Sequence, residues 1–76
     1  MLTTIAEETW FYVLEHDDET DDYILDVCCG TVAIYTIKIK LNDEERADYL
    51  KDPSSIRTLA YRINDYPNEY MDRRVD

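Results

Sequence analysis

The clearest pattern in the chain lies in residues 23–41, where β-branched and aromatic side chains alternate with polar ones. In the second half of this stretch, apolar side chains recur at every second position, as in a strand with one buried face: Ala33, Tyr35, Ile37, Ile39 and Leu41. Gly30, the only glycine of the protein, separates the two halves and reaches positive φ without a steric penalty. Residues 23–41 therefore predict a β-hairpin that turns at Gly30.

A second β-rich run precedes this hairpin at residues 9–16. Large apolar side chains occupy both alternating sets of positions near its start, with Trp10 directly beside Phe11. Such a strand is covered on both faces, or meets another subunit on its second face. A helix that begins at Thr3 is the alternative interpretation, and residues 1–6 carry no pattern that assigns them to an element.

After the hairpin the pattern changes from strand to helix. Asn42 and Glu45 stand in the capping-box relation, which predicts a helix from there to about Lys51. Pro53 is suited to the first turn of a second helix, and Pro67 ends it. Apolar residues recur at helical spacing in this second helix and predict a buried stripe: Ile56, Leu59, Ala60 and Ile63.

These elements join into a single small α+β domain over residues 1–76. Residues 17–22 hold five acids and one threonine, and such a run repels itself and belongs in a solvated loop between strands. Short connections between consecutive strands favour an antiparallel meander. The sequence therefore predicts a three-stranded antiparallel sheet followed by two helices packed on one face, in the order β-β-β-α-α.

Composition and chain length add three expectations to this picture. A hydrophobic fraction of 45% and seven tyrosines favour a folded chain despite a net charge of -10. A chain of 76 residues buries only about 60% of the surface that its unfolded form exposes, which favours a homodimer. Neither a secretory signal nor an apolar run of membrane-spanning length is present, so we expect a cytoplasmic protein without a membrane partner.

The negative charge is concentrated in the first half of the chain. Residues 1–37 contain nine acids and no lysine or arginine, whereas residues 38–76 contain nine acids and eight basic residues. This asymmetry disfavours direct binding to nucleic acid, because a protein must neutralise phosphates to bind them. It favours a basic protein partner instead, since complementary charge speeds encounter and excludes wrong partners.

We therefore predict a small acidic binding protein that sequesters or inhibits a basic protein, one that itself binds nucleic acid in the simplest case. Immunity proteins against nucleases and inhibitors of host defence work in this broad way, which is an analogy of charge and size only. The alternative is a homo-oligomeric structural or accessory protein whose acidity serves solubility alone. The predicted partner-binding residues are the acids of the loop and strand ends and three aromatic residues nearby in the sequence: Glu15, Asp17, Asp18, Glu19, Asp21, Asp22, Asp26, Trp10, Tyr12 and Tyr23.

The chain contains few residues suited to catalysis, and we predict neither an enzyme nor a cofactor site. His16, the only histidine, pairs near Tyr23 if residues 17–22 close a hairpin, which leaves the cysteines at the far end of the strands. Cys28 and Cys29 are adjacent and are interpreted as small buried hydrophobes rather than as a redox pair. The alternating acids of the loop lack the glycine and the later glutamate of a calcium-binding EF-hand, so no metal site is predicted.

Overall fold

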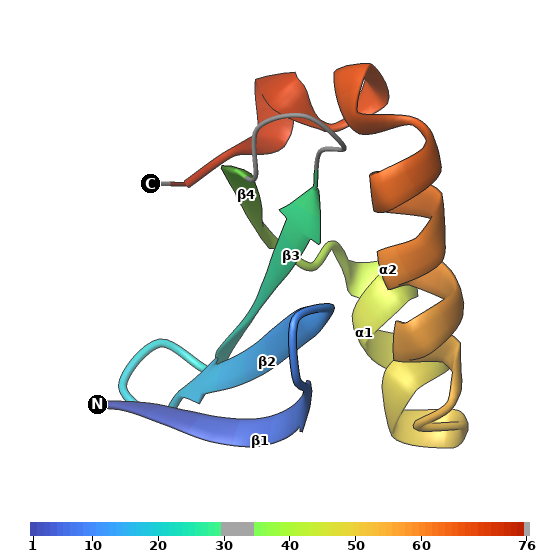
Figure 1. Cartoon of the computed structure of the whole chain (residues 1–76). Coiled ribbons are helices and arrows are strands. Elements are labelled where there is room, and N and C mark those ends of the chain that lie inside the picture. Colours follow the sequence, from blue (N-terminus) through green and yellow to red (C-terminus); the bar gives the residue numbers. More distant parts are fainter. Residues whose placement is uncertain (30–34, 76) are drawn as a thin grey trace.

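The computed structural model describes residues 1–29 and 35–75, which form a four-stranded sheet followed by helices. The elements in chain order are β1 (Leu2–Glu8), β2 (Tyr12–Asp17), β3 (Asp22–Cys29), β4 (Tyr35–Lys40), α1 (Asp43–Lys51), α2 (Ser55–Asp65) and the short 3-10 helices η1 (Pro67–Glu69) and η2 (Met71–Arg73). Each strand pairs antiparallel with the next, in the order β1-β2-β3-β4 (Figure 1). The sheet is therefore a simple meander.

The predicted three-stranded sheet is wrong, because β1 adds a fourth strand over residues that the sequence pattern left largely unassigned. The register between β1 and β2 shifts between Thr4 and Ala6, so Ile5 is an extra residue in the strand. A bulge of this kind interrupts the period-two alternation by which a strand is recognised. The α+β class and the two helices after the sheet agree with the prediction.

The strand predicted at residues 9–16 begins later than expected. Residues 9–11 form the turn between β1 and β2, in which the Phe11 amide donates a hydrogen bond to the Glu8 carbonyl oxygen at 3.0 Å. Strand pairing starts at Tyr12. The turn contains neither glycine nor asparagine, and its aromatic residues are typical of strands, so composition alone indicated a longer strand.

The hairpin of β3 and β4 pairs as the sequence pattern predicted. Leu25 lies opposite Ile39, and Val27 lies opposite Ile37. All four side chains are inaccessible to solvent. The predicted turn at Gly30, and Ala33 with it, lie outside the described residues.

Both helices lie on the same face of the sheet, and α2 packs against β3 (Figure 1). The predicted stripe of α2 is confirmed, since Ile56, Ala60 and Ile63 are buried and Leu59 packs against them. The core is completed by alternate residues of the strands and by residues near the ends of β4 and η1: Tyr12, Leu14, Leu25, Val27, Cys29, Ile37, Ile39, Leu41 and Tyr70. The core therefore occupies one side of the sheet only.

The predicted cap of α1 is also present and is tied to the end of the chain. The Asn42 side chain accepts a hydrogen bond from the Glu45 amide at 2.8 Å, and Glu45 accepts one from the Asn42 amide at 3.0 Å. Arg73 donates two further hydrogen bonds to the same Glu45 carboxylate, at 2.6 and 3.0 Å. Glu45 thus connects the start of α1 to η2.

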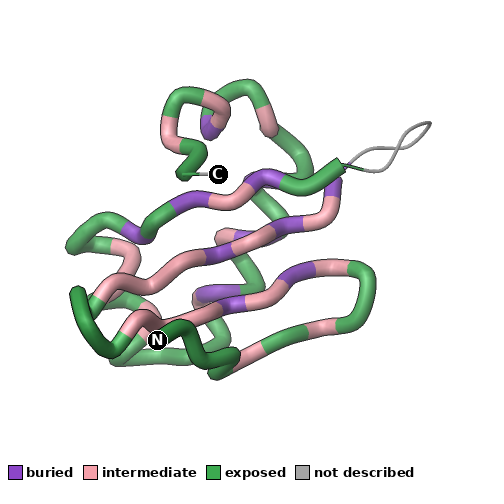
Figure 2. The backbone as a smooth tube through the Cα atoms, turned by 90° about the vertical axis from the view of Figure 1, so that its left-hand side faces the viewer, coloured by how far each residue is buried: buried purple, intermediate pink, exposed green. Residues whose placement is uncertain are grey.

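The opposite face of the sheet carries no helix of the described chain (Figure 1). Figure 2 looks toward this side, and buried residues alternate there with partly exposed ones along β2 and β3. The side chains of β2 and β3 that point away from the helices form what we call the open face, and they are Val13, Glu15, Ile24, Asp26 and Cys28. None of the described helices has the length and apolar character that crossing a bilayer requires.

Candidate functional site

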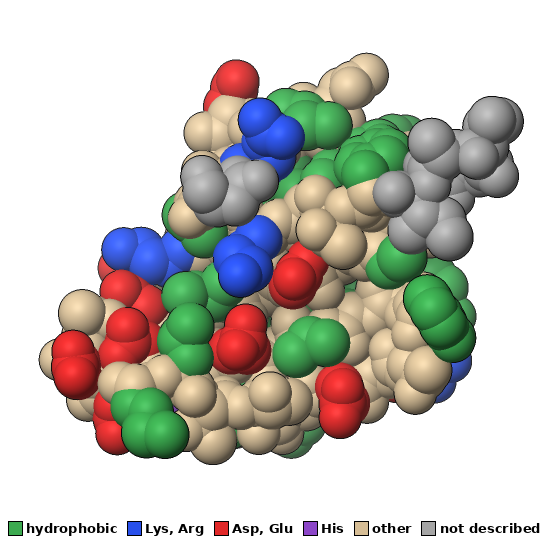
Figure 3. Space-filling model, turned by 60° about the vertical axis from the view of Figure 1, so that its left-hand side comes forward, with side chains coloured by type: hydrophobic (Ala, Val, Ile, Leu, Met, Phe, Trp, Pro, Cys, Tyr) green, Lys and Arg blue, Asp and Glu red, His purple; other side chains and the backbone are tan. Residues whose placement is uncertain are grey.

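The register of the sheet fixes which side chains share the open face. One row across the four strands consists of Glu7, Val13, Asp26 and Lys38, each paired with the next. Figure 3 shows acidic side chains scattered among apolar ones over the lower part of this face, with Lys and Arg toward its upper left. The open face is therefore acidic and apolar over β1 to β3 and basic along β4.

The acidic loop between β2 and β3 is largely occupied by contacts within the molecule. Asp21 lies 2.8 Å from His16 Nε2 and 3.7 Å from the Arg46 guanidinium. Asp22 lies 3.5 Å from the Lys40 ammonium. The hydrogen bond from His16 lowers the pKa of Asp21 below its ordinary value, so this carboxylate is already stabilised by its own chain.

The first acids of the loop also have partners within the chain. Asp17 accepts a hydrogen bond from the Glu19 amide at 3.0 Å, and this bond is the main cause that lowers the pKa of Asp17. The Met1 amino group lies 2.7 Å from Asp18 and 3.4 Å from Asp17. Of the predicted acidic residues, Glu15 and Asp26 instead lie on the open face.

The three predicted aromatic residues do not gather around the acidic loop. Tyr12 is only 8% exposed and belongs to the core. Tyr23 is half-buried and packs on His16, with ring centroids 4.7 Å apart, and toward Tyr49. Trp10 lies in the β1–β2 turn, at the opposite end of the strands from residues 17–22, and is 83% exposed. The structure therefore separates the one exposed aromatic residue of this set from the loop.

The backbone of Trp10 has φ of 64°, in the left-handed region. This conformation is rare for a bulky residue and costs about 1–2 kcal/mol, because the Cβ atom approaches the following carbonyl. The neighbouring Phe11 anchors the turn by packing on Tyr61 at 4.6 Å and on Tyr12 at 5.2 Å between ring centroids. The packed turn thus holds the Trp10 side chain in solvent, at a conformational cost.

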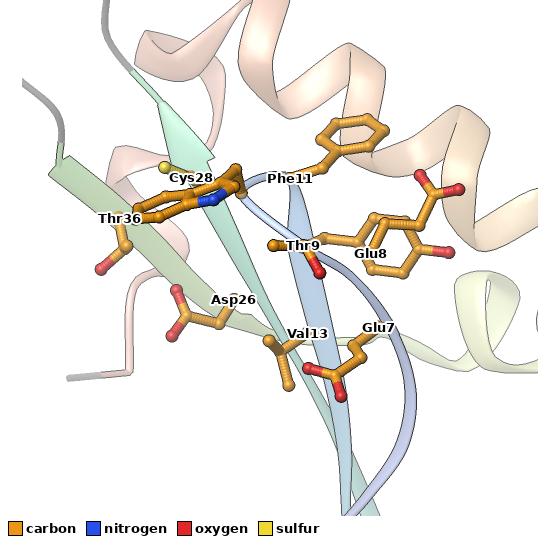
Figure 4. A pocket seen from close by; sticks show the side chains of 10 residues that line it. Glu7, Glu8, Thr9, Phe11, Val13, Asp26, Cys28 and Thr36 are labelled. Carbon is orange, nitrogen blue, oxygen red and sulfur yellow. The ribbon is translucent and has the colours of Figure 1, made fainter.

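A pocket of about 450 Å³ opens beside Trp10 on the open face. Figure 4 shows Val13 between Glu7 and Asp26 on this face, with Cys28 and Thr36 on the neighbouring part of the sheet. The walls combine apolar groups with carboxylates, and the side chains that matter for its chemistry are Glu7, Trp10, Val13, Asp26, Cys28 and Thr36. The mixture suits a ligand that is partly apolar and partly cationic.

One oxygen of Asp26 is unsatisfied. Its Oδ1 atom is shielded from solvent and accepts no hydrogen bond in the part of the chain that the structure describes. Lys38 is its partner in the strand register, but no ion pair within 4.0 Å joins the two among the described residues. A buried acceptor without a donor costs about 1–3 kcal/mol, so a rotation of the Asp26 side chain that brings this oxygen to a donor at the pocket surface would be favourable.

Sequence analysis named Trp10, Tyr12 and Asp26 but not the other residues that line this pocket. The available signal was strand parity, since Cys28 shares its face with Asp26, and Thr36 is the register partner of Cys28. Glu7 could not be found in this way, because β1 was not predicted. The pocket joins all four strands and the β1–β2 turn, and its position depends on the register between the strands.

The strand register also fixes the positions of His16, Cys28 and Cys29, the residues considered for a catalytic role. His16 lies opposite Tyr23, as expected, and Cys28 and Cys29 are at the other end of β3. Burial raises the pKa of the Cys29 thiol, so Cys29 is stabilised in its neutral form. Within residues 1–29 and 35–75, no three acidic, histidine or cysteine side chains are grouped so that they could hold a metal ion.

Comparisons of the chain with protein-family models, with curated proteins and with solved structures found no match.

Proposed function

We propose that this protein binds a basic protein partner on the open face of its sheet, next to the β1–β2 turn. The observation that carries the proposal is Trp10, whose side chain is held in solvent by a left-handed backbone at the rim of a pocket that contains an unsatisfied carboxylate oxygen. Strained residues concentrate at functional sites, and exposed tryptophan is a frequent anchor of protein interfaces. Trp10 supplies the anchor, and Glu7 and Asp26 supply the complementary charge.

The same reasoning moves the proposed contact away from the acidic loop. Asp21 and Asp22 have cationic partners within the chain, and Asp17 is hydrogen-bonded to its own loop. Acids with such partners gain less from a new cation than an acid without one. The loop then contributes to the long-range field that attracts a basic protein, rather than to the contact.

Binding of this kind would cover a positively charged surface of the partner protein. A protein that binds nucleic acid presents clustered Lys and Arg, and an acidic sheet face competes for that surface. The product is a sequestered or inhibited partner. No catalytic step is required of this chain.

Affinity capture from a lysate of the source cells tests the proposal, with the purified protein as bait at low and at high salt. We expect the unmodified chain to retain a basic protein at low salt and to release part of it at high salt. Trp10→Ala should lose most of this retention. Tyr66→Ala is the matched control, because Tyr66 is a 60% exposed aromatic residue at the end of α2, and it should retain the partner.

A second pair of variants separates the two acidic regions. Glu7→Gln with Asp26→Asn should weaken retention, whereas Asp18→Asn with Glu19→Gln, which removes the same charge from the loop, should have little effect. Equal retention by all variants, or no retained basic protein at all, would contradict the proposal and favour acidity that serves solubility alone.

A further inference from the structure

The pocket beside Trp10 has the chemistry of a receptor for one particular type of side chain. Val13 and Cys28 are half-buried and line it with apolar surface, and Trp10 adds the face of an indole ring. Asp26 adds the oxygen that is shielded from water and lacks a donor. A group that fits both must be apolar along its length and cationic at its tip.

We propose that this pocket receives an arginine side chain of the basic partner, an inference that rests on the function proposed above. The guanidinium donates hydrogen bonds to the Asp26 carboxylate, whose shielded Oδ1 atom comes to the pocket surface when the side chain rotates, and its flat face packs on the indole of Trp10. Glu7, which lies two positions from Asp26 in the same row of the sheet, offers a second carboxylate to the remaining N–H groups. The volume of about 450 Å³ leaves room for the side chain and adjacent atoms of the partner.

Arginine fits this site better than lysine for three physical reasons. The guanidinium is planar and stacks on aromatic rings, whereas an ammonium group does not. It is also more weakly hydrated, so its transfer to a pocket with apolar walls costs less. Finally, its several N–H donors reach two carboxylates at once, which a compact ammonium group does less well.

Titration of the full chain with two short peptides, hexaarginine and hexalysine, tests the proposal at low salt. Both carry the same charge, so an affinity that depends on charge alone is equal for the two. The first readout is the emission of Trp10, which is the only tryptophan of the protein and reports directly on the pocket. The second is calorimetry, which applies equally to variants that lack the indole.

We expect hexaarginine to bind about tenfold more tightly than hexalysine and to shift the emission of Trp10. Asp26→Asn keeps the shape of the side chain and should weaken hexaarginine binding by about tenfold. Asp18→Asn removes the same charge from the exposed loop and should change the affinity less than threefold, as a screened surface charge does. Circular dichroism of each variant verifies that it is folded.

The outcomes separate this inference from the proposed function. If both peptides bind equally, and Asp26→Asn behaves like Asp18→Asn, the arginine pocket is overturned while the binding of basic partners stands. If neither peptide binds at low salt, the attraction to basic partners itself is contradicted.

Discussion

At the scale of single residues, Trp10 combines broad exposure with an unfavourable backbone conformation. An indole in solvent gains nothing from burial, and a left-handed φ of 64° destabilises the folded state. Folding therefore provides no reason for tryptophan at this position. A role in recognition, where the ring becomes buried against a partner, accounts for both properties.

Substitution of Trp10 should reveal this conformational cost. Glycine adopts positive φ freely but alanine does not, so Trp10→Gly should be more stable than Trp10→Ala by about 1 kcal/mol. Urea denaturation of both variants measures the difference in the free energy of unfolding. Alanine and glycine variants of equal stability would show that the turn is not strained.

The exposure of a residue could be predicted from the sequence only where its neighbours along the chain determine it. Tyr12 and Tyr23 were assigned to the interface because they flank residues 17–22 in the sequence. Tyr12 instead shares the face of Leu14 and is buried with it. Exposure depends on which face of the sheet the helices cover, and the local sequence around Tyr12 does not contain that information.

At the scale of elements, Glu45 links three parts of the fold. It completes the cap of α1, it pairs with Arg73 of η2, and Arg73 in turn donates a hydrogen bond to the Lys40 carbonyl oxygen of β4 at 3.1 Å. Burial of Glu45 acts to raise its pKa, but the hydrogen bonds from Arg73 and from the Asn42 amide outweigh burial, so the pKa of Glu45 is lowered. The folded protein thus favours the ionised form.

Acid should weaken this connection in a predictable direction. Because the pKa of Glu45 is lower in the folded state, its contribution is complete above its ordinary value of 4.5 and is lost as the pH falls below it. Glu45→Gln should reduce the free energy of unfolding at pH 7 by about 1–2 kcal/mol and flatten its decline between pH 5 and 3. Chemical denaturation across this range measures both effects. A variant with unchanged pH dependence would contradict the assignment.

The helices were predictable because their signals are local. The capping box of Asn42 and Glu45 and the stripe of α2 each lie within a few turns of one element. The part played by Arg73 was not predictable, since its partner Glu45 is 28 residues away. Likewise, β1 escaped prediction because the bulge at Ile5 breaks the alternation, and only pairing with β2 restores the strand.

At the scale of the whole molecule, charge is distributed unevenly over a sheet that is covered on one side. The nine acids of residues 1–37 lie on β1 to β3 and their connections. The lysine and arginine residues lie on β4 and in the helical segment that follows it. This distribution could be predicted from the sequence. Its division between the loop and the open face could not, because it depends on strand register and on ion pairs between distant residues such as Arg46 and Asp21.

A net charge of -10 on so small a domain should oppose folding through repulsion between the acids. Sodium chloride screens this repulsion, so the midpoint of thermal unfolding should rise between low and physiological salt, by roughly 4–8 °C for a gain of about 1 kcal/mol. Scanning calorimetry measures the shift. The rise should be smaller in Asp18→Asn with Glu19→Gln, and a fall in the midpoint would mean that the ion pairs dominate.

The alternation along the strands has a consequence for how such a protein changes over generations. The core contains alternate residues of three strands, such as Leu14, Leu25 and Ile37. The residues next to them along each strand face away from the helices. Substitutions at the outward positions disturb folding less than substitutions in the core, and they alter what the surface recognises. A lineage of these chains can therefore exchange one target for another while the buried alternate residues of β2, β3 and β4 preserve the architecture.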